Sequence, residues 1–394
     1  MAILTPWMLN WLQQAWNISW LLNINPEFWH RLAMMTSNSA ERIDFIVNSL
    51  KEALYFEDSR LETQVWNMTC RNQIWLAAWF AKQSHWLKLL EAFWFGYITI
   101  WWITVNAQEW NLKPRIFKFP ESQSMVNGMW LPWDGLENEV KRLAKRKELW
   151  LMPNIPIIAN LCNSLLTQAE DKTDEFLFMM DKLYPYVDWF EINVSCPNQC
   201  WVTSMQKEKV LKDLLIKVTQ YNKLLALRNL CERKTILVKI APLTKYENEP
   251  ERIKDLSKDG LEIIANVCNE VWIDWVTATN TSQEHEYDTK IIKPDWSIIK
   301  WWLSWLWLHE QSLKTVSELR KVLNRTIPII WVWWIWYDAK ESWLSAINML
   351  DNWAWALWLM SCFIQNSVVS PYWLKQKLLE HKIANNKREN SFKF

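Results

Sequence analysis

Residues 190–198 read Phe-Glu-Ile-Asn-Val-Ser-Cys-Pro-Asn and predict a short buried strand that stops at a polar loop. Apolar residues alternate along its first half, as they do in a β-strand. The proline has no N–H to donate, so regular strand pairing should end there. The strand end then presents a thiol between two amides, from Asn193, Cys196 and Asn198. Such a thiol could transfer a proton beside a flat polar ligand. The alternative is a strand end with an inert cysteine.

Short apolar runs of this kind recur from about residue 62 onward, and helical spacing follows them. Eight β–α repeats in one stretch of chain predict an α/β fold with a closed (β/α)8 barrel, a TIM barrel. A doubly wound open sheet is the alternative. The expected strands cover residues 74–78, 97–100, 155–160, 190–194, 236–240, 273–277, 327–332 and 356–360, with helices at 174–183, 209–225, 253–268 and 313–323.

The chain divides into three parts on this interpretation. Residues 1–60 should form a small helical extension, because residues 43–54 have helical spacing and Asn25-Pro26-Glu27 is typical of a helix start. Residues 61–380 form the barrel domain, and residues 381–394 form a solvated C-terminal tail. The extension could serve packing, a partner surface or contact with a membrane surface.

The overall composition excludes several classes of protein. The chain has 394 residues, with 44 basic and 43 acidic side chains, so no general attraction to nucleic acid or anionic lipid is expected. Seven cysteines without a secretory signal pattern fit a reducing cytoplasm. No uninterrupted apolar run is long enough for a spanning helix. Cys196 and Cys200 lack a second pair or a nearby histidine, so no metal site is expected.

Glycine and tryptophan occur in abnormal numbers. The chain has 4 glycines and 34 tryptophans, whereas ~7% glycine is usual. Many tryptophans stand where glycine-rich loops are expected, as in residues 301–305 and 330–336. We infer that most of them stand for glycine, because a UGA codon that the source reads as glycine would give this pattern when translated as tryptophan. The alternative is a protein with indoles packed beside its strand ends.

Polar residues gather at the predicted carboxyl ends of the strands, where barrels of this type carry their functional groups. Lys239 lies within an apolar strand, which is costly unless an anionic cofactor or a buried carboxylate pairs with it. The Trp/Gly-rich loops after the last two strands are where such barrels bind a phosphate group. This set suggests a phosphorylated flat heterocycle, and flavin mononucleotide (FMN) fits it. The polar strand ends are Lys82, Asn160, Asn193, Cys196, Lys239 and Thr279-Asn280-Thr281.

Seven motifs in order resemble the dihydroorotate dehydrogenase family over essentially the whole chain. They lie at residues 75–82, 127–131, 191–198, 238–242, 279–281, 301–305 and 329–335. The helical extension, with Asn25-Pro26-Glu27 and His30, resembles that of the membrane-associated class that uses quinone. The resemblance implies a flavoprotein of pyrimidine biosynthesis that oxidises dihydroorotate to orotate. It also implies a peripheral position on the cytoplasmic side of the cell's inner membrane.

The resemblance also implies roles for individual residues. Cys196 would take a proton from C5 of dihydroorotate while hydride passes from C6 to the flavin. Gly is suspected at Trp102, Trp305 and Trp334, because an indole in the phosphate site would exclude the cofactor. Substrate would contact Lys82, Asn127, Gly128, Met129, Trp130, Leu131, Asn193, Asn198, Asn280 and Thr281. The flavin would contact Ala77, Ala78, Ala81, Trp102, Asn160, Asn193, Lys239, Thr279, Trp305, Trp334, Met360 and Ser361.

Several positions depart from the family pattern of the quinone class, in which serine is the usual base. Cys196 is instead the base of the soluble classes, which pass electrons to fumarate or NAD. Ala81 replaces an aspartate, Gln199-Cys200 replaces Thr-Pro, and Met360 stands where tyrosine is common. These departures leave the electron acceptor open. Quinone is favoured because the N-terminal extension has no purpose in the shorter soluble classes.

Two functions of other kinds compete with this one. A flavin-dependent reductase of uridine in transfer RNA shares the barrel and a Cys-Pro pair, but it needs a basic face and an RNA-binding domain. The near-zero net charge argues against it. If every tryptophan is literal, the chain is instead a barrel without cofactor, which serves at most as a binding scaffold.

Overall fold

The computed structural model of the chain describes most of the barrel region in detail. The ranges described are residues 39–65, 68–109, 111–113, 116–119, 124–127, 133–164, 172–195, 207–245, 255–282, 291–292, 296, 298–299, 302–333, 346–351, 354–359 and 370–391. The statements below concern these residues.

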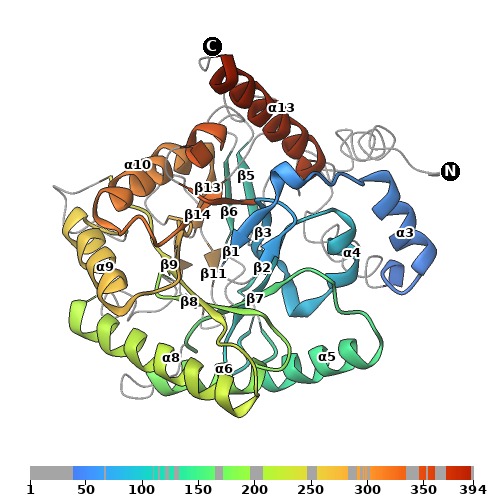
Figure 1. Cartoon of the computed structure of the whole chain (residues 1–394). Coiled ribbons are helices and arrows are strands. Elements are labelled where there is room, and N and C mark those ends of the chain that lie inside the picture. The colour runs from blue at the N-terminus through green and yellow to red at the C-terminus, as the bar shows by residue number, and fades with distance from the viewer. Residues whose placement is uncertain are drawn as a thin grey trace.

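A closed barrel of eight parallel strands forms the centre of the molecule (Figure 1). The strands pair in the order β10-β14-β15-β3-β4-β7-β8-β9. This closure confirms the predicted (β/α)8 barrel and excludes the open sheet, and each of the eight expected strands is present. Their bounds are β3 Ile74–Ala81, β4 Ile98–Ile103, β7 Ile157–Leu161, β8 Trp189–Asn193, β9 Thr235–Ile240, β10 Trp275–Ala278, β14 Ile329–Trp333 and β15 Ala356–Leu359.

Helices surround the barrel and bury the outward faces of its strands (Figure 1). Helix α9 begins at Lys258, after the predicted start at 253, because Ser257 caps its first turn by accepting a hydrogen bond from Gly260 N. Helix α5 was not predicted. The barrel helices are α4 Leu87–Ala92, α5 Leu136–Glu148, α6 Lys172–Leu183, α8 Glu208–Arg228, α9 Lys258–Val271 and α10 Leu306–Val322.

Smaller elements decorate the barrel. A three-stranded sheet, in the order β13-β6-β5, and two short hairpins lie outside the main sheet. Helix α13 runs from Ser370 to Ser391, so the chain is helical across the expected boundary at residue 380. The remaining elements are α3 Asp44–Ala53, η2 Ser59–Leu61, β1 Thr63–Val65, β2 Met68–Cys70, η3 Lys82–Ser84, β5 Ile116–Phe119, β6 Ser124–Asn127, β11 Ile291–Ile292, β12 Ile298–Ile299 and β13 Trp302–Trp305.

The interior of the barrel is divided into an aromatic end and a polar end. Trp75, Tyr97, Trp189 and Trp275 lie at the amino ends of their strands, and their ring centroids are 4.4–5.9 Å apart. Apolar packing of this kind closes one end of the barrel and excludes water. The carboxyl ends of β7, β8, β9 and β10 carry buried polar side chains instead. The functional groups are therefore expected at the carboxyl end of the barrel.

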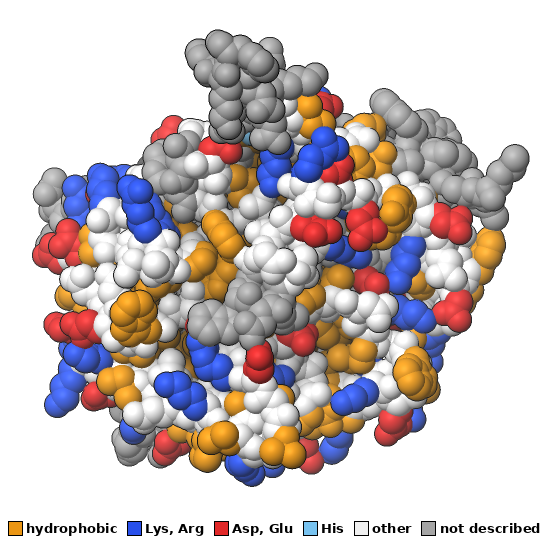
Figure 2. All heavy atoms as spheres, in the orientation of Figure 1, with side chains coloured by type: hydrophobic (Ala, Val, Ile, Leu, Met, Phe, Trp, Pro, Cys, Tyr) orange, Lys and Arg blue, Asp and Glu red, His pale blue; other side chains and the backbone are white. Residues whose placement is uncertain are grey.

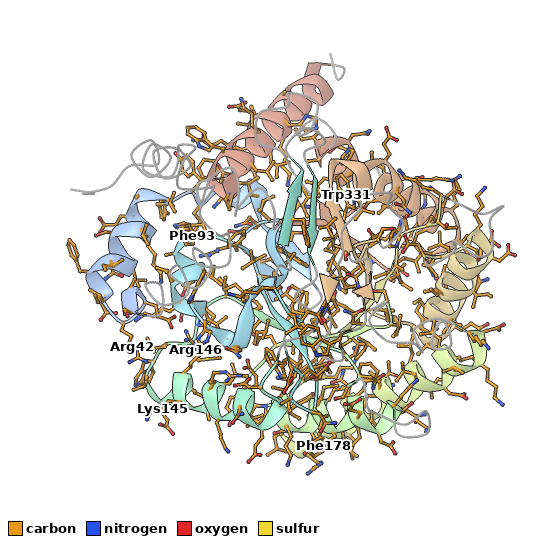
Figure 3. All side chains as sticks on the ribbon, turned by 180° about the vertical axis from the view of Figure 1, so that it is seen from behind. Arg42, Phe93, Lys145, Arg146, Phe178 and Trp331 are labelled. Carbon is orange, nitrogen blue, oxygen red and sulfur yellow. The ribbon has the colours of Figure 1, made fainter. Side chains whose placement is uncertain are left out.

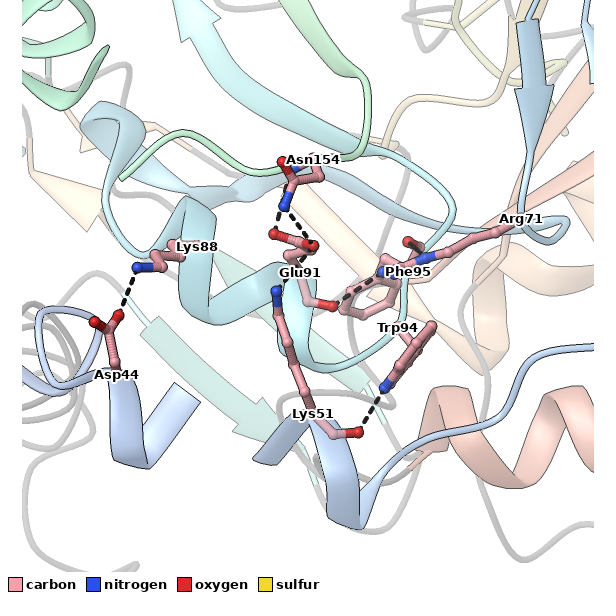
Figure 4. Close-up of polar contacts among 8 residues, drawn as sticks. All are labelled: Asp44, Lys51, Arg71, Lys88, Glu91, Trp94, Phe95 and Asn154. Carbon is pink, nitrogen blue, oxygen red and sulfur yellow. Dashed lines mark hydrogen bonds and ion pairs between the residues drawn. The ribbon is translucent and has the colours of Figure 1, made fainter. Parts of the chain in front are cut away.

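Helix α3 is fixed to the barrel by ion pairs with α4 (Figure 4). Lys88 pairs with Asp44 at 2.8 Å, and Lys51 pairs with Glu91 at 3.0 Å. Glu91 also accepts a hydrogen bond from Asn154 N. The predicted helix at residues 43–54 is confirmed by α3, and residues 1–38 lie outside the described part of the chain.

Helix α5 provides a second link to this region. Arg146 donates hydrogen bonds to both carboxylate oxygens of Glu41 at 2.7 Å, and this pair is buried. In the view from behind, Arg146 and Lys145 lie on this helix (Figure 3). Removing one partner of such a buried bidentate pair strongly destabilises the fold, because the other charge is left buried without its partner. The pair therefore fixes the described end of the N-terminal extension against the barrel.

Five tryptophans adopt the left-handed backbone region. Trp86, Trp94, Trp150, Trp272 and Trp296 have φ between 56° and 65°. A bulky side chain is an outlier in this region, which glycine enters freely. Trp272 is the C-cap of α9, the end of a helix where glycine is most common, and its side chain is 69% exposed. The backbone of Trp272 therefore has the conformation that glycine adopts most readily.

A chain made with Trp272→Gly is expected to be more stable than the chain with tryptophan by about 1 kcal/mol, because the left-handed conformation costs a side-chain residue about 1–2 kcal/mol. Urea unfolding followed by circular dichroism measures the difference. Trp355→Gly is the matched control, since Trp355 is 42% exposed and has no positive φ. Equal effects at both positions would contradict the backbone argument.

Candidate active site

Neighbouring strands β7 to β10 direct polar side chains into the barrel. Asn160 pairs in register with Glu191, Asn193 with Lys239, and Lys239 with Thr277. All five side chains are buried, with Glu191 and Thr277 at 0% exposure. Parallel strands place paired residues side by side on the same face, so their side chains meet inside the barrel. The structure therefore brings together Asn160, Asn193 and Lys239, three of the residues that the resemblance assigns to the flavin.

Hydrogen bonds connect these residues into one cluster. Asn193 Nδ2 donates to Asn160 Oδ1 at 3.3 Å, and Asn160 Nδ2 donates to Glu191 Oε2. The Lys239 ammonium lies 4.0 Å from the same carboxylate oxygen. The buried-carboxylate alternative for Lys239 is thus realised by Glu191. Burial raises the pKa of Glu191, and the Lys239 charge, the Thr277 hydroxyl and the Asn160 amide partly offset that rise.

Two oxygens of this cluster have no hydrogen bond within the described part of the chain. They are Glu191 Oε1 and Thr277 Oγ1, and both are buried. Buried polar atoms are normally paired, and an orphan of this kind indicates a missing donor such as a water or a ligand. A cationic and amide-rich cluster with spare hydrogen-bonding capacity suits a flat heterocycle with carbonyl and ring nitrogen atoms. The residues present therefore fit a flavin.

Ser195 joins the end of β8 to the loop after β10. Asn193 Oδ1 accepts hydrogen bonds from Ser195 N at 3.1 Å and from Ser195 Oγ at 3.0 Å. Asn280 Nδ2 donates to Ser195 O at 3.2 Å and to Ser195 Oγ at 3.1 Å. The hydroxyl thereby fixes the orientation of both amides, which the sequence had assigned to ligand binding. Ser195 was missed, because a serine before the cysteine gives no separate signal.

The residues after Asn280 continue this arrangement. Thr281 N donates a hydrogen bond to Asn280 Oδ1 at 3.0 Å. The Asn280 side chain therefore contacts the backbone at the start of the loop. Thr279 is buried, and its hydroxyl lies 3.5 Å from Ser312 on α10. The indole of Trp331 donates to the same Ser312 hydroxyl at 2.7 Å. Trp331 is completely buried there and appears beside α10 in Figure 3.

The end of β3 supplies the other wall of the candidate site. Ala77, Ala78 and Ala81 are buried, and the chain then enters η3 at Lys82. Ser84 in this turn has φ 48° and donates a hydrogen bond to Glu139, which is completely buried on α5. Left-handed backbone at a non-glycine residue persists only where its surroundings hold it.

A clamp on α5 provides that support. Arg142 donates to Glu139 Oε2 at 2.6 Å and also binds both carboxylate oxygens of Asp134. The backbone of Lys82 is therefore fixed through Ser84 to Glu139 and Arg142. None of these supporting residues was predicted, because they act through the turn and not through the ligand.

Three further predicted residues are placed only in part. Trp102 on β4 is buried, at 8% exposure. Asn127 ends β6 and Trp305 ends β13, and these strands pair antiparallel with Trp302 opposite Asn127. Nine predicted site residues lie outside the described ranges and remain predictions: Gly128, Met129, Trp130, Leu131, Cys196, Asn198, Trp334, Met360 and Ser361.

A buried polar cluster at the carboxyl end of an eight-stranded barrel is shared by many enzymes, so sequence relationships decide the family. The family model for dihydroorotate dehydrogenase matches residues 60–335. The chain belongs to the dihydroorotate dehydrogenase family. The match begins just before β1 and ends after β14, so it contains every described residue of the cluster.

Individual relatives agree with this assignment. The dihydroorotate dehydrogenase (quinone) of Gloeobacter violaceus is 31% identical over 263 residues, which are 66% of this chain and 67% of the relative. The dihydroorotate dehydrogenase (quinone) of Christiangramia forsetii is 28% identical over 360 residues, 91% of this chain and 96% of the relative.

A solved structure shows the same fold. The Eimeria tenella dihydroorotate dehydrogenase in complex with ferulenol aligns with a TM-score of 0.73 at 21% identity, covering 92% of this chain and 93% of that one. Such an identity supports the fold and not the function. In the part of the chain that the structure describes, no helix has the length and apolar character needed to cross a membrane.

Proposed function

We propose that this chain is a flavin-dependent enzyme that oxidises dihydroorotate to orotate, in pyrimidine biosynthesis, and passes the electrons to a quinone. The observation that carries the proposal is the cluster on β7 to β10. It brings Asn160, Asn193 and Lys239, expected to bind the flavin, into one network with Asn280, expected to bind the substrate. The family match supplies the substrate class.

The cofactor proposed is FMN, which when bound accepts hydride from the substrate. Asn160, Asn193, Lys239 and Thr279 would hold its ring system. The ammonium of Lys239 would interact with the electronegative edge of the ring, and the amides would orient it. The cluster residues are themselves buried, and a low dielectric constant strengthens such interactions.

The proton is proposed to leave C5 of the substrate for the Cys196 thiolate. An ordinary thiol has a pKa of about 8.5, so it acts as a base near neutral pH only where its surroundings favour the thiolate. Asn193 and Asn280, fixed by Ser195, would hold the substrate's ring beside this base. Ser195 immediately precedes Cys196 in the sequence, and its hydroxyl contacts both of these amides.

We also propose that most of the tryptophans are glycines in the native protein. The five tryptophans in the left-handed backbone region support this, because that region suits glycine and opposes an indole. The proposal explains how a phosphate could approach the backbone after β13 and β14. Mass spectrometry of the native protein checks it, since each replacement lowers the mass by a fixed large amount.

Quinone is the proposed acceptor, and contact with a membrane surface is proposed for residues 1–60. The quinone enzymes among the relatives support the acceptor. Helix α3 exposes apolar side chains, with Phe45 at 63% and Ile43 at 48%, which would favour a surface contact on the cytoplasmic side of the inner membrane. The transfer-RNA alternative is not favoured, because acidic and basic side chains are interspersed on the face shown in Figure 2.

The experiment is an assay of the chain made with glycine at the suspected positions and loaded with FMN. We expect dihydroorotate-dependent reduction of a soluble quinone analogue, and much slower turnover with fumarate or NAD as acceptor. Fumarate or NAD as the faster acceptor would overturn the quinone assignment. Absence of dihydroorotate oxidation with every acceptor, despite bound flavin, would overturn the proposed reaction.

A further inference from the structure

Glu191 is an acid in the barrel interior to which the family resemblance gives no role. It lies in the middle of β8, its exposure is 0%, and its neighbours on both sides are completely buried. The carboxylate contacts the Asn160 amide and faces the Lys239 ammonium at 4.0 Å. Asn193 joins the same network through Asn160. One carboxylate is therefore linked to all three barrel-interior residues that are expected to touch the flavin.

Stability alone gives no reason for this arrangement. Removing two charges from water costs more than their attraction returns unless the geometry is excellent, and apolar replacements of a buried pair are often as stable. Here the separation is long for an ion pair, and one carboxylate oxygen has no described hydrogen bond. A buried charge kept at such a cost indicates a function in electrostatics.

The geometry points to Glu191 as a positioning residue that balances the charge of Lys239 and thereby lowers the reduction potential of the bound flavin. This inference rests on the proposed flavin site. A protein tunes the electronic properties of its cofactor through nearby charges and hydrogen bonds. Glu191 acts through Asn160 on β7 and Lys239 on β9, because its carboxylate accepts a hydrogen bond from the Asn160 amide and faces the Lys239 ammonium.

The sign of the effect follows from the charges. Reduction adds electrons to the flavin, so a positive charge without a counter-charge favours the reduced form. Glu191→Gln keeps the size of the side chain and its bond to Asn160, but it removes the negative charge that faces the Lys239 ammonium at 4.0 Å. The reduction potential should therefore rise. In a site with a low dielectric constant this interaction is screened much less than at a surface.

The test measures the flavin's reduction potential by equilibration with a reference dye, in FMN-loaded protein with glycine at the suspected positions. For Glu191→Gln we expect the equilibrium constant with the dye to change by about tenfold towards reduced flavin, which is about 30 mV for a two-electron couple. Asp188→Asn is the matched control. Asp188 is a half-buried acid three residues earlier on the same stretch; it accepts a hydrogen bond from Ile157 N at 2.8 Å, and its replacement should leave the potential unchanged.

A second comparison covers the case in which Glu191→Gln alone prevents folding. The double variant Glu191→Gln with Lys239→Gln is compared with Lys239→Gln alone, because loss of Lys239 removes a proposed flavin contact by itself, and we expect the two equilibrium constants to agree within about twofold. An unshifted Glu191→Gln, or a double variant displaced from Lys239→Gln as far as Glu191→Gln is displaced from the parent, would overturn the inference while the parent still binds flavin. A parent that binds no flavin would overturn the proposed function and this inference with it.

Discussion

Cys196→Ala is expected to lower the rate of dihydroorotate oxidation by at least about a hundredfold while one flavin per chain stays bound, because a positioned general base contributes about 10²–10⁴ to the rate. The loss should appear in the reductive half of the reaction. Mixing the oxidised enzyme with dihydroorotate and following the loss of the flavin's visible absorbance in a stopped-flow instrument measures that step alone. The step should be slow in the variant at every substrate concentration.

Two further substitutions test whether the loss is specific to the Cys196 thiol. Cys200→Ala removes a thiol four residues away and should leave the rate within about twofold of the parent. Cys196→Ser keeps a group that can accept the proton, but a hydroxyl is a weaker base than a thiolate at neutral pH, so an intermediate rate is expected. If Cys196→Ala reduces its flavin as fast as the parent, another residue takes the proton and the assignment is wrong.

The barrel could be predicted from sequence because its strands are buried on both faces. Parallel strands of this kind give nearly continuous apolar runs, such as residues 236–240 with Lys239 as the single polar residue, which stand out from the polar helices between them. Helix α5 was missed because its surface is mostly charged and only a few positions, such as Leu136 and Leu143, are apolar and buried. The β13-β6-β5 sheet was missed because its strands have four residues each and β13 pairs with β6 across a long separation in sequence.

The part of the candidate site that lies at the carboxyl ends of the strands could be predicted from the sequence. Asn160, Asn193, Lys239 and Asn280 drew notice because polar residues in or directly after an apolar run are unusual, and the structure buries all four, while their binding roles stay predictions. Glu191 was not recognised as a partner of Lys239, because only the register of β8 against β9 and the barrel's curvature bring the two side chains together. Contacts between strands depend on register, which a single sequence does not state.

The second large effect expected concerns flavin binding. The chain with glycine at the suspected positions should bind flavin, and the chain with tryptophan restored at 305 and 334 should not. Backbone N–H groups of a glycine-rich loop can approach a phosphate closely, whereas an indole would occupy that space. Trp305 ends β13, directly before α10, and Trp334 is the next residue in the sequence after β14, which is a barrel strand. We expect about one FMN per chain in the glycine form and essentially none after both tryptophans are restored.

The control restores tryptophan at positions that cannot reach the cofactor. Trp150 and Trp272 follow helices α5 and α9, and their side chains are 86% and 69% exposed. Restoring these two should reduce stability by about 1–2 kcal/mol each, because both are in the left-handed region, but flavin content should not change. Flavin content is read from the visible absorbance of the purified protein and from FMN released on denaturation. Equal flavin in all three forms would show that an indole is tolerated beside the phosphate, and the case for glycine would then rest on the backbone conformations alone.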